Sequence, residues 1–373
     1  MFFILGISIS VFLLFLLLIK KNKSSADKIL LIWLLLLFVH QLFNYLAQTN
    51  EIEKYPHLLG VDFPFPVLQG VLLFMYVLTI TGRKLKKRFY YILHFIPSIS
   101  LVLLAIPFYS LSGAEKIAVM NDPVKDYWWY LIYYNSLMFI SGLGYSLWSL
   151  YVIRKHQKRI QQSFSNTDKK ELQWLQYLSI GLGIIWFIVL FADDTRFIFT
   201  GVVILVLFIG FFGINQMNIF QTNAVLESNF LKIEEEKIEN NENSKPAATT
   251  TKRYAKSGLT EEMAAKIYTN LNELMTKESL FNDNDITLTE LAKRLDVHPN
   301  HLSQVINEKE EKNFYNYINA LRIKAFIKLA SLPESKKYTL LSLAYDCGFN
   351  SKSTFNKHFK ENTGKTPTEY FKS

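Results

Sequence analysis

The chain has 373 residues, which is enough for about two or three domains, and half of its residues are hydrophobic while only 20% are charged. The formal net charge of +9 fits anionic lipid, nucleic acid or both as partners, so its distribution has to decide between them. The single cysteine, Cys347, excludes an intramolecular disulfide and any zinc site built from several cysteines, which fits a functional domain in a reducing compartment.

Residues 1–215 carry seven apolar stretches and are predicted to form a transmembrane helical bundle. Most of the stretches approach the ~20 apolar residues that a helix needs to cross about 30 Å of hydrocarbon. The third is the weakest, because it begins between Pro64 and Pro66. The seven stretches are Phe2–Ile19, Ile29–Ala47, Phe65–Ile80, Phe89–Tyr109, Tyr127–Ile153, Trp174–Ala192 and Phe197–Ile214.

The first stretch is interpreted as an uncleaved span rather than a signal peptide. No lysine or arginine precedes it, no small-residue cleavage site follows it, and the basic cluster comes after it. A signal peptide has the reverse order of charge.

Loop charges predict the orientation of the bundle. The first, third and fifth loops carry 15 lysines and arginines in total, whereas the second, fourth and sixth carry four. Basic loops stay on the cytoplasmic side of a membrane. Seven spans with the N-terminus outside therefore put the C-terminal part in the cytoplasm.

Residues 216–253 are predicted to be a linker. Its start, Val225–Ile238, has a charged helical pattern, and its later part, Ser244–Thr251, is rich in Ser, Pro, Ala and Thr. A short coiled coil is one interpretation of the helical part, and a solvated helix followed by a flexible tether is the other.

Residues 254–373 are predicted to be an all-α domain with two helix-turn-helix units, at 287–308 and 339–363, joined by a long helix over 313–331. Ala292 and Ala344 stand where two helices must approach closely. Gly348 stands at the turn of the second unit, where a positive φ favours glycine, and Asp296 has the same place in the first unit.

The second unit resembles the signature of AraC/XylS-type transcription regulators. The pattern A-x-x-x-G-F, S-x-S-x-F-x-x-x-F-K and G-x-x-P-x-x-Y is met by Ala344, Gly348, Phe349, Ser351, Ser353, Phe355, Phe359, Lys360, Gly364, Pro367 and Tyr370. The resemblance covers about 110 residues, and segments 254–260 and 313–323 also look like the subgroup attached to membrane sensors. The first 215 residues do not resemble the sugar-binding cupin of many family members.

The resemblance implies double-stranded DNA as a partner, with the second helix of each unit in the major groove of successive turns ~34 Å apart. Carried over by position, the base-contacting residues are Asn300, Ser303, Gln304, Lys352, Ser353 and Lys357, whose side chains can pair with base edges. Lys360 and Lys365 are interpreted as phosphate contacts. Leu302, Val305, Phe355 and Phe359 point the other way and are expected in the core.

The charge of this domain predicts dimeric or clustered binding to DNA, and a homodimer on DNA is expected. Residues 256–373 hold 17 basic and 15 acidic side chains, a net charge of only +2, so one copy should bind DNA weakly.

Other polar residues give weaker evidence for a functional site. His298 and His301 have a metal-like spacing, but His298 occupies a helix-cap position, so no metal is expected. His40, Asn44 and Gln48 recur along one side of the second stretch and predict either a ligand pocket or a hydrogen-bond network between helices. No nucleophile–base set and no phosphate-binding glycine loop is found, so neither enzymatic activity nor a cofactor is expected.

The chain is therefore expected to be a multi-pass sensor in the cytoplasmic (inner) membrane of a bacterium. It would couple a small-molecule or envelope signal to promoter binding, with the lipid bilayer as a further partner. A transporter or an intramembrane enzyme with an appended DNA-binding tail is the alternative interpretation.

Overall fold

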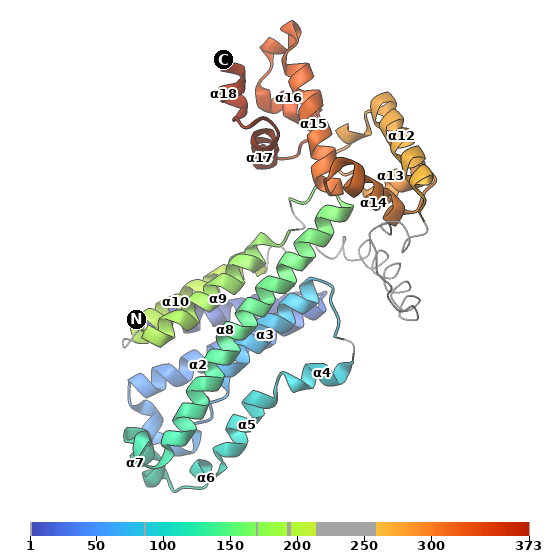
Figure 1. Cartoon of the computed structure of the whole chain (residues 1–373). Coiled ribbons are helices and arrows are strands. Elements are labelled where there is room, and N and C mark those ends of the chain that lie inside the picture. Colours follow the sequence, from blue (N-terminus) through green and yellow to red (C-terminus); the bar gives the residue numbers. More distant parts are fainter. Residues whose placement is uncertain (1, 86, 169–170, 192–194, 214–258, 373) are drawn as a thin grey trace. The chain divides into compact units, whose positions relative to one another are not determined.

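The computed structural model describes residues 2–85, 87–168, 171–191, 195–213 and 259–372. Over these residues the regular elements are helices, with one isolated antiparallel bridge between Phe164 and Thr287, which confirms the all-α prediction for the described part. The chain divides into two compact units, Met1–Arg154 with Gln173–Asn243 and Lys155–Leu172 with Ser244–Ser373 (Figure 1). Both parts of the predicted linker, Val225–Ile238 and Ser244–Thr251, lie outside the described residues.

The first unit is built from apolar helices around α3. Helix α3 contacts α2, α5 and α9, while α1 contacts α2 and α10. Nearly all of α3 is buried, and its Gly70 lets α8 approach so closely that an added Cβ would lie 2.7 Å from the backbone oxygen of Ser141. The helices of this unit are α1 (Phe2–Ile19), α2 (Ser25–Gln48), α3 (Phe65–Ile80), α4 (Arg88–Leu93), α5 (Ile96–Leu104), α6 (Ile106–Tyr109), α7 (Gly113–Asn121), α8 (Pro123–Ser163, of which the part from Lys155 belongs to the second unit), α9 (Gln173–Phe191) and α10 (Thr195–Phe208), with short turns η1 (Glu51–Lys54) and η2 (Pro56–Leu58) and a π-helical end η3 (Ile209–Gly213).

Local chemistry explains why α2 begins where it does. Ser24 and Asp27 form a capping box, in which the Ser24 side chain accepts from the backbone N–H of Asp27 and the Asp27 carboxylate accepts from the backbone N–H of Ser24. Lys20 Nζ lies 2.9 Å from the buried Asp27 carboxylate. The basic first loop is therefore tied to the start of α2.

Among the described residues, α2 and α8 are long and apolar enough to cross a bilayer, whereas α1, α3, α9 and α10 are shorter apolar helices. The stretch Phe89–Tyr109 is not a continuous helix but is divided into α4, α5 and α6. Pro97 and Pro107 each stand in the first turn of the following helix, because proline lacks the N–H that a helix interior requires. The stretch expected to be weakest, Phe65–Ile80, is one helix.

The second unit follows the predicted pattern of short helices and one long helix closely. Its helices are α12 (Glu261–Glu278), η4 (Leu280–Asn282), α13 (Leu288–Arg294), α14 (Pro299–Glu310), α15 (Phe314–Ala330), η5 (Pro333–Lys337), α16 (Leu340–Asp346), α17 (Lys352–Thr363) and α18 (Pro367–Lys372). The described residues 155–168 and 171–172, which the sequence assigns to a loop of the apolar region, belong to this compact unit.

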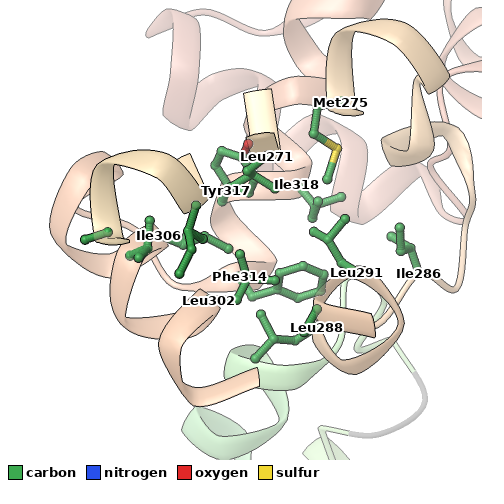
Figure 2. Close-up of a cluster of buried hydrophobic side chains, with 14 of the residues drawn as sticks. Leu271, Met275, Ile286, Leu288, Leu291, Leu302, Ile306, Phe314, Tyr317 and Ile318 are labelled. Atoms are coloured by element: carbon green, nitrogen blue, oxygen red, sulfur yellow. The ribbon is translucent and has the colours of Figure 1, made fainter. Parts of the chain in front are cut away.

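Helix α15 contributes to two separate hydrophobic cores. Its first half places Phe314 and Ile318 in a core with Leu291 and Leu302, drawn in Figure 2. Its second half places Phe326 in another core, which also contains Phe349, Phe355 and Phe359. The linking helix is therefore part of the interior of both helix-turn-helix units.

Candidate nucleic-acid interface

The first helix-turn-helix unit consists of α13, a tight turn and α14. A capping box between Thr287 and Glu290 starts α13. The turn is made by Asp296 at φ 53°, as predicted, and His298 Nδ1 accepts the backbone N–H of Asn300 at 3.1 Å to cap α14. The predicted capping position of His298 is therefore confirmed. Within the described residues no group of three or more His, Cys, Asp or Glu side chains is placed to hold a metal ion.

The second helix-turn-helix unit repeats this construction with α16 and α17. Gly348 has φ 89°, so the predicted positive φ at this turn is confirmed. The Ser351 hydroxyl accepts the backbone N–H of Thr354 at 3.2 Å and caps α17, which ends at Gly364 with φ 77°. Ala292 and Ala344 are both fully buried, in keeping with the close helix approach expected at these positions.

Each second helix has one buried face, and the residues predicted to contact DNA lie off that face. Leu302, Val305, Phe355 and Phe359 are in the cores, as expected. The predicted DNA contacts Asn300, Lys352, Ser353, Lys357, Lys360 and Lys365 are exposed, and Ser303 and Gln304 are half-buried.

The two half-buried side chains already have hydrogen bonds along α14. Gln304 Nε2 donates to Glu308 Oε1 at 3.0 Å, and Ser303 Oγ accepts from Asn307 Nδ2 at 3.4 Å. Base recognition by Gln304 would therefore require its amide to exchange the Glu308 partner for a base edge.

His358 is a titratable residue of α17, and its side chain is buried inside the domain. Its ring packs edge-on against Tyr315 at 4.9 Å, and its Nδ1 lies 3.1 Å from Glu361 Oε2. Burial lowers the pKa of His358 to about 4, and the positive charges of Lys357 and Arg322 add to this. At neutral pH the contact with Glu361 is therefore a hydrogen bond from a neutral imidazole.

Arg322 lies at the junction of the two helix-turn-helix units, and no sequence pattern indicates this role. It is only 2% exposed, and its guanidinium donates to the backbone oxygens of Phe281 and Asp283 at 2.7 Å each and to Asn319 Oδ1 at 3.2 Å. Burial lowers the pKa of Arg322 to about 10, opposed by the Asp283 carboxylate, so the side chain stays charged at neutral pH. A buried arginine bonded to carbonyl oxygens fixes the loop after α12 to α15.

The polar row of α2 is only partly brought together. His40 and Asn44 line a cavity of about 240 Å³ with Gln69 and Trp186, but Gln48 is not part of its wall. Asn44 Nδ2 donates to the backbone oxygen of His40 within the same helix.

Two hydrogen bonds between helices of this unit come from other residues. Trp33 Nε1 donates to Gln69 Oε1 at 2.7 Å, and Gln41 Nε2 donates to Ser10 Oγ at 3.3 Å. Gln41 and Gln69 are glutamines within apolar stretches, and this feature of the sequence could have indicated that they bond between helices.

Comparison with known proteins agrees with the helix-turn-helix geometry of the second compact unit. A family model described as a helix-turn-helix domain matches residues 291–373, from within α13 to the last residue. No curated protein and no solved structure matches the chain. The matched family is typically not enzymatic. The chain therefore carries a helix-turn-helix domain at its C-terminal end, and the match supports an AraC-type DNA-binding transcription regulator.

Proposed function

We propose that the chain is a membrane-bound, sequence-specific transcription regulator that couples a signal at the membrane to promoter binding by its helix-turn-helix domain. The DNA-binding part rests on the family match and on the two capped helix-turn-helix units that carry exposed lysines and amides.

The observation that carries the membrane part is the surface of the first unit. Large apolar side chains more than half exposed occur on α1, α8 and α9, and they include Phe12, Phe15, Ile140, Leu147 and Phe191. Soluble monomers rarely expose apolar side chains on this scale. Hydrocarbon solvates such side chains well, and the loop charges agree with insertion in one orientation.

The signal is proposed to enter through the apolar unit. His40 and Asn44 belong to the wall of its cavity, so a small molecule or a change in the bilayer that favours one packing of these helices would shift the equilibrium between two states. The effect on promoters is proposed to depend on two copies binding together, because tethering raises the local concentration of a partner domain.

Topology tests the membrane assignment. Reporter fusions after Lys87, Gln162 and Lys252 are expected to score cytoplasmic, and fusions after Glu53 and Asp122 extracytoplasmic. A cytoplasmic score at Asp122 would break the seven-span arrangement.

A genome-wide map of bound DNA tests the regulatory assignment. The full chain is expected to occupy a limited set of promoters, and removal of residues 1–215 is expected to change their occupancy. Identical maps for both forms would separate DNA binding from the membrane region and refute the coupling.

A further inference from the structure

The segment Phe164–Asp168 lies between α8 and α9 in the chain and packs against the helix-turn-helix residues of its own compact unit. Phe164 forms an antiparallel bridge with Thr287, and Ser165 N donates to Ile286 O at 3.3 Å. Ser165 is almost completely buried. The segment therefore adds a short extended piece to the entrance of the first helix-turn-helix unit, as peptides do at exposed backbone edges.

The same segment also contacts the linking helix α15. Ser165 O accepts from Asn319 Nδ2 and from Arg322 Nη1, both at 3.4 Å, and Ser165 Oγ lies 3.3 Å from Arg322 Nη2. Asn319 and Arg322 are both buried. A serine hydroxyl and carbonyl thus complete the partner set of the guanidinium that joins the two units.

A third contact reaches the recognition helix of the second unit. Thr354 Oγ1 donates to Asp168 Oδ1 at 2.6 Å, a short, charge-assisted hydrogen bond. Thr354 belongs to the first turn of α17, directly after Lys352 and Ser353, the predicted base contacts. The first turn of a helix favours an anion, and recognition helices use such positions for DNA phosphates.

We propose that Ile286–Thr287, Asn319, Arg322 and Thr354 form a docking surface for the segment Phe164–Asp168, and that the docked segment weakens DNA binding. This inference rests on the proposed function, whose regulation it specifies. The docked segment holds the first helix-turn-helix unit, α15 and α17 in one arrangement. Its Asp168 carboxylate occupies a position at the start of α17 that favours an anion, beside the predicted DNA contacts. Release of the segment leaves that position to a phosphate.

The ends of the segment explain how a signal would reach it. Both ends continue along the chain into apolar helices, α8 before it and α9 after it. A stimulus that favours a packing of α8 and α9 incompatible with the docked segment therefore has a different affinity for the docked and released states. Such a difference is the thermodynamic requirement for coupling.

A disulfide lock tests docking directly. The hydrogen bond from Ser165 N to Ile286 O makes Phe164 and Thr287 a non-hydrogen-bonded antiparallel pair, with Cα atoms typically about 4.5 Å apart, close enough for a disulfide. In the full chain in native membranes, the double variant Phe164→Cys/Thr287→Cys is expected to form this disulfide under mild oxidation. Absence of the disulfide when both thiols react with maleimide would show that the segment is not docked.

DNA binding by the same protein tests the regulatory consequence. The probe is a fluorescein-labelled duplex selected with the full chain from a random library. The oxidised double variant is expected to bind it on the order of tenfold more weakly than the reduced form, a usual size for coupling between sites. The two single-cysteine variants control for the substitutions themselves. Equal affinity before and after oxidation would overturn the proposal.

A charge variant tests the role of Asp168. Asp168→Asn is expected to raise the affinity of the full chain about two- to fivefold, the usual value of one charge near a helix terminus. Glu334→Gln, at an exposed position of η5, removes the same charge elsewhere and is expected to have a smaller effect. Equal gains from both variants would reduce the Asp168 effect to net charge and refute phosphate competition. A full chain that binds no duplex in any form would refute the proposed function instead, while the disulfide result still reports docking.

Discussion

Replacement of Gly348 by alanine is the sharpest test of how the two helix-turn-helix units are joined. Gly348 has φ 89°, and a Cβ built there would lie 2.7 Å from Phe281 O, 2.9 Å from Asn282 O and 3.0 Å from Arg322 Nε. The first two atoms are backbone, and the third belongs to the buried guanidinium that donates to Phe281 O. The methyl group therefore has no flexible neighbour to displace.

The expected loss is the sum of two effects. A left-handed backbone costs a residue with a Cβ roughly 1–2 kcal/mol. Forcing a methyl into a packed interior typically costs about 1–3 kcal/mol more. We expect Gly348→Ala to lower the free energy of unfolding by about 3 kcal/mol.

Gly364 provides the matched control. It also has a positive φ, 77°, but a Cβ added there would have nothing within 4 Å. Gly364→Ala should therefore carry only the backbone cost of roughly 1–2 kcal/mol. Urea unfolding of a fragment that starts at Lys252, followed by circular dichroism, measures both variants. Equal losses would mean that the loop after α12 does not press on Gly348, and the account of the Arg322 junction would be wrong.

Three further outcomes follow from the same domain. Lys357→Ala should cost roughly 1–3 kcal/mol of DNA binding and relax one base position, whereas Lys360→Ala should weaken all sequences alike and flatten the salt dependence, both measured by fluorescence anisotropy. Burial lowers the pKa of His358 to about 4, from an ordinary value near 6.5. The neutral side chain therefore stabilises the fold fully above about pH 6.5, and this stabilisation is lost as the pH falls from there towards 4. Between pH 6.5 and 5 we expect a loss of about 1.6 kcal/mol in the free energy of unfolding, measured by urea unfolding, and we expect His358→Gln to lack this loss. A soluble fragment from Lys252 should bind DNA weakly, and fusion to a dimer-forming helix should restore tight binding; equal affinities would refute control by pairing.

The helix-turn-helix units could be predicted because each local feature agreed with the others. The positions carried over from the resemblance placed Leu302, Val305, Phe355 and Phe359 inside, and the turn at Gly348 required an unusual φ that the sequence marks with glycine. Helices with an apolar period and caps are determined largely by residues that lie within about twenty positions of one another in the chain. Sequence patterns record such local features well.

The junction of the units could not be predicted, because its partners are backbone atoms from distant segments. No pattern in the sequence shows that the backbone oxygens of Phe281 and Asp283 converge on Arg322. Ser165 lies in a basic loop, whose composition reports only orientation in a membrane. Hydropathy likewise read Phe89–Tyr109 as one span, since an average over a window does not register that Pro97 and Pro107 interrupt the backbone hydrogen bonds.

The small charge of the DNA-binding region makes weak contacts sufficient for control. With a net charge of +2 over residues 256–373, one copy is expected to gain little from phosphate attraction and to bind DNA weakly. A change of 1.4 kcal/mol alters a binding constant by about tenfold. The hydrogen bond between Thr354 and Asp168, together with the contacts of Ser165, is of that order. A strongly basic domain would stay on DNA whether or not this segment was docked, whereas under the proposed regulation this weakly charged domain gains affinity for DNA when the five-residue segment undocks.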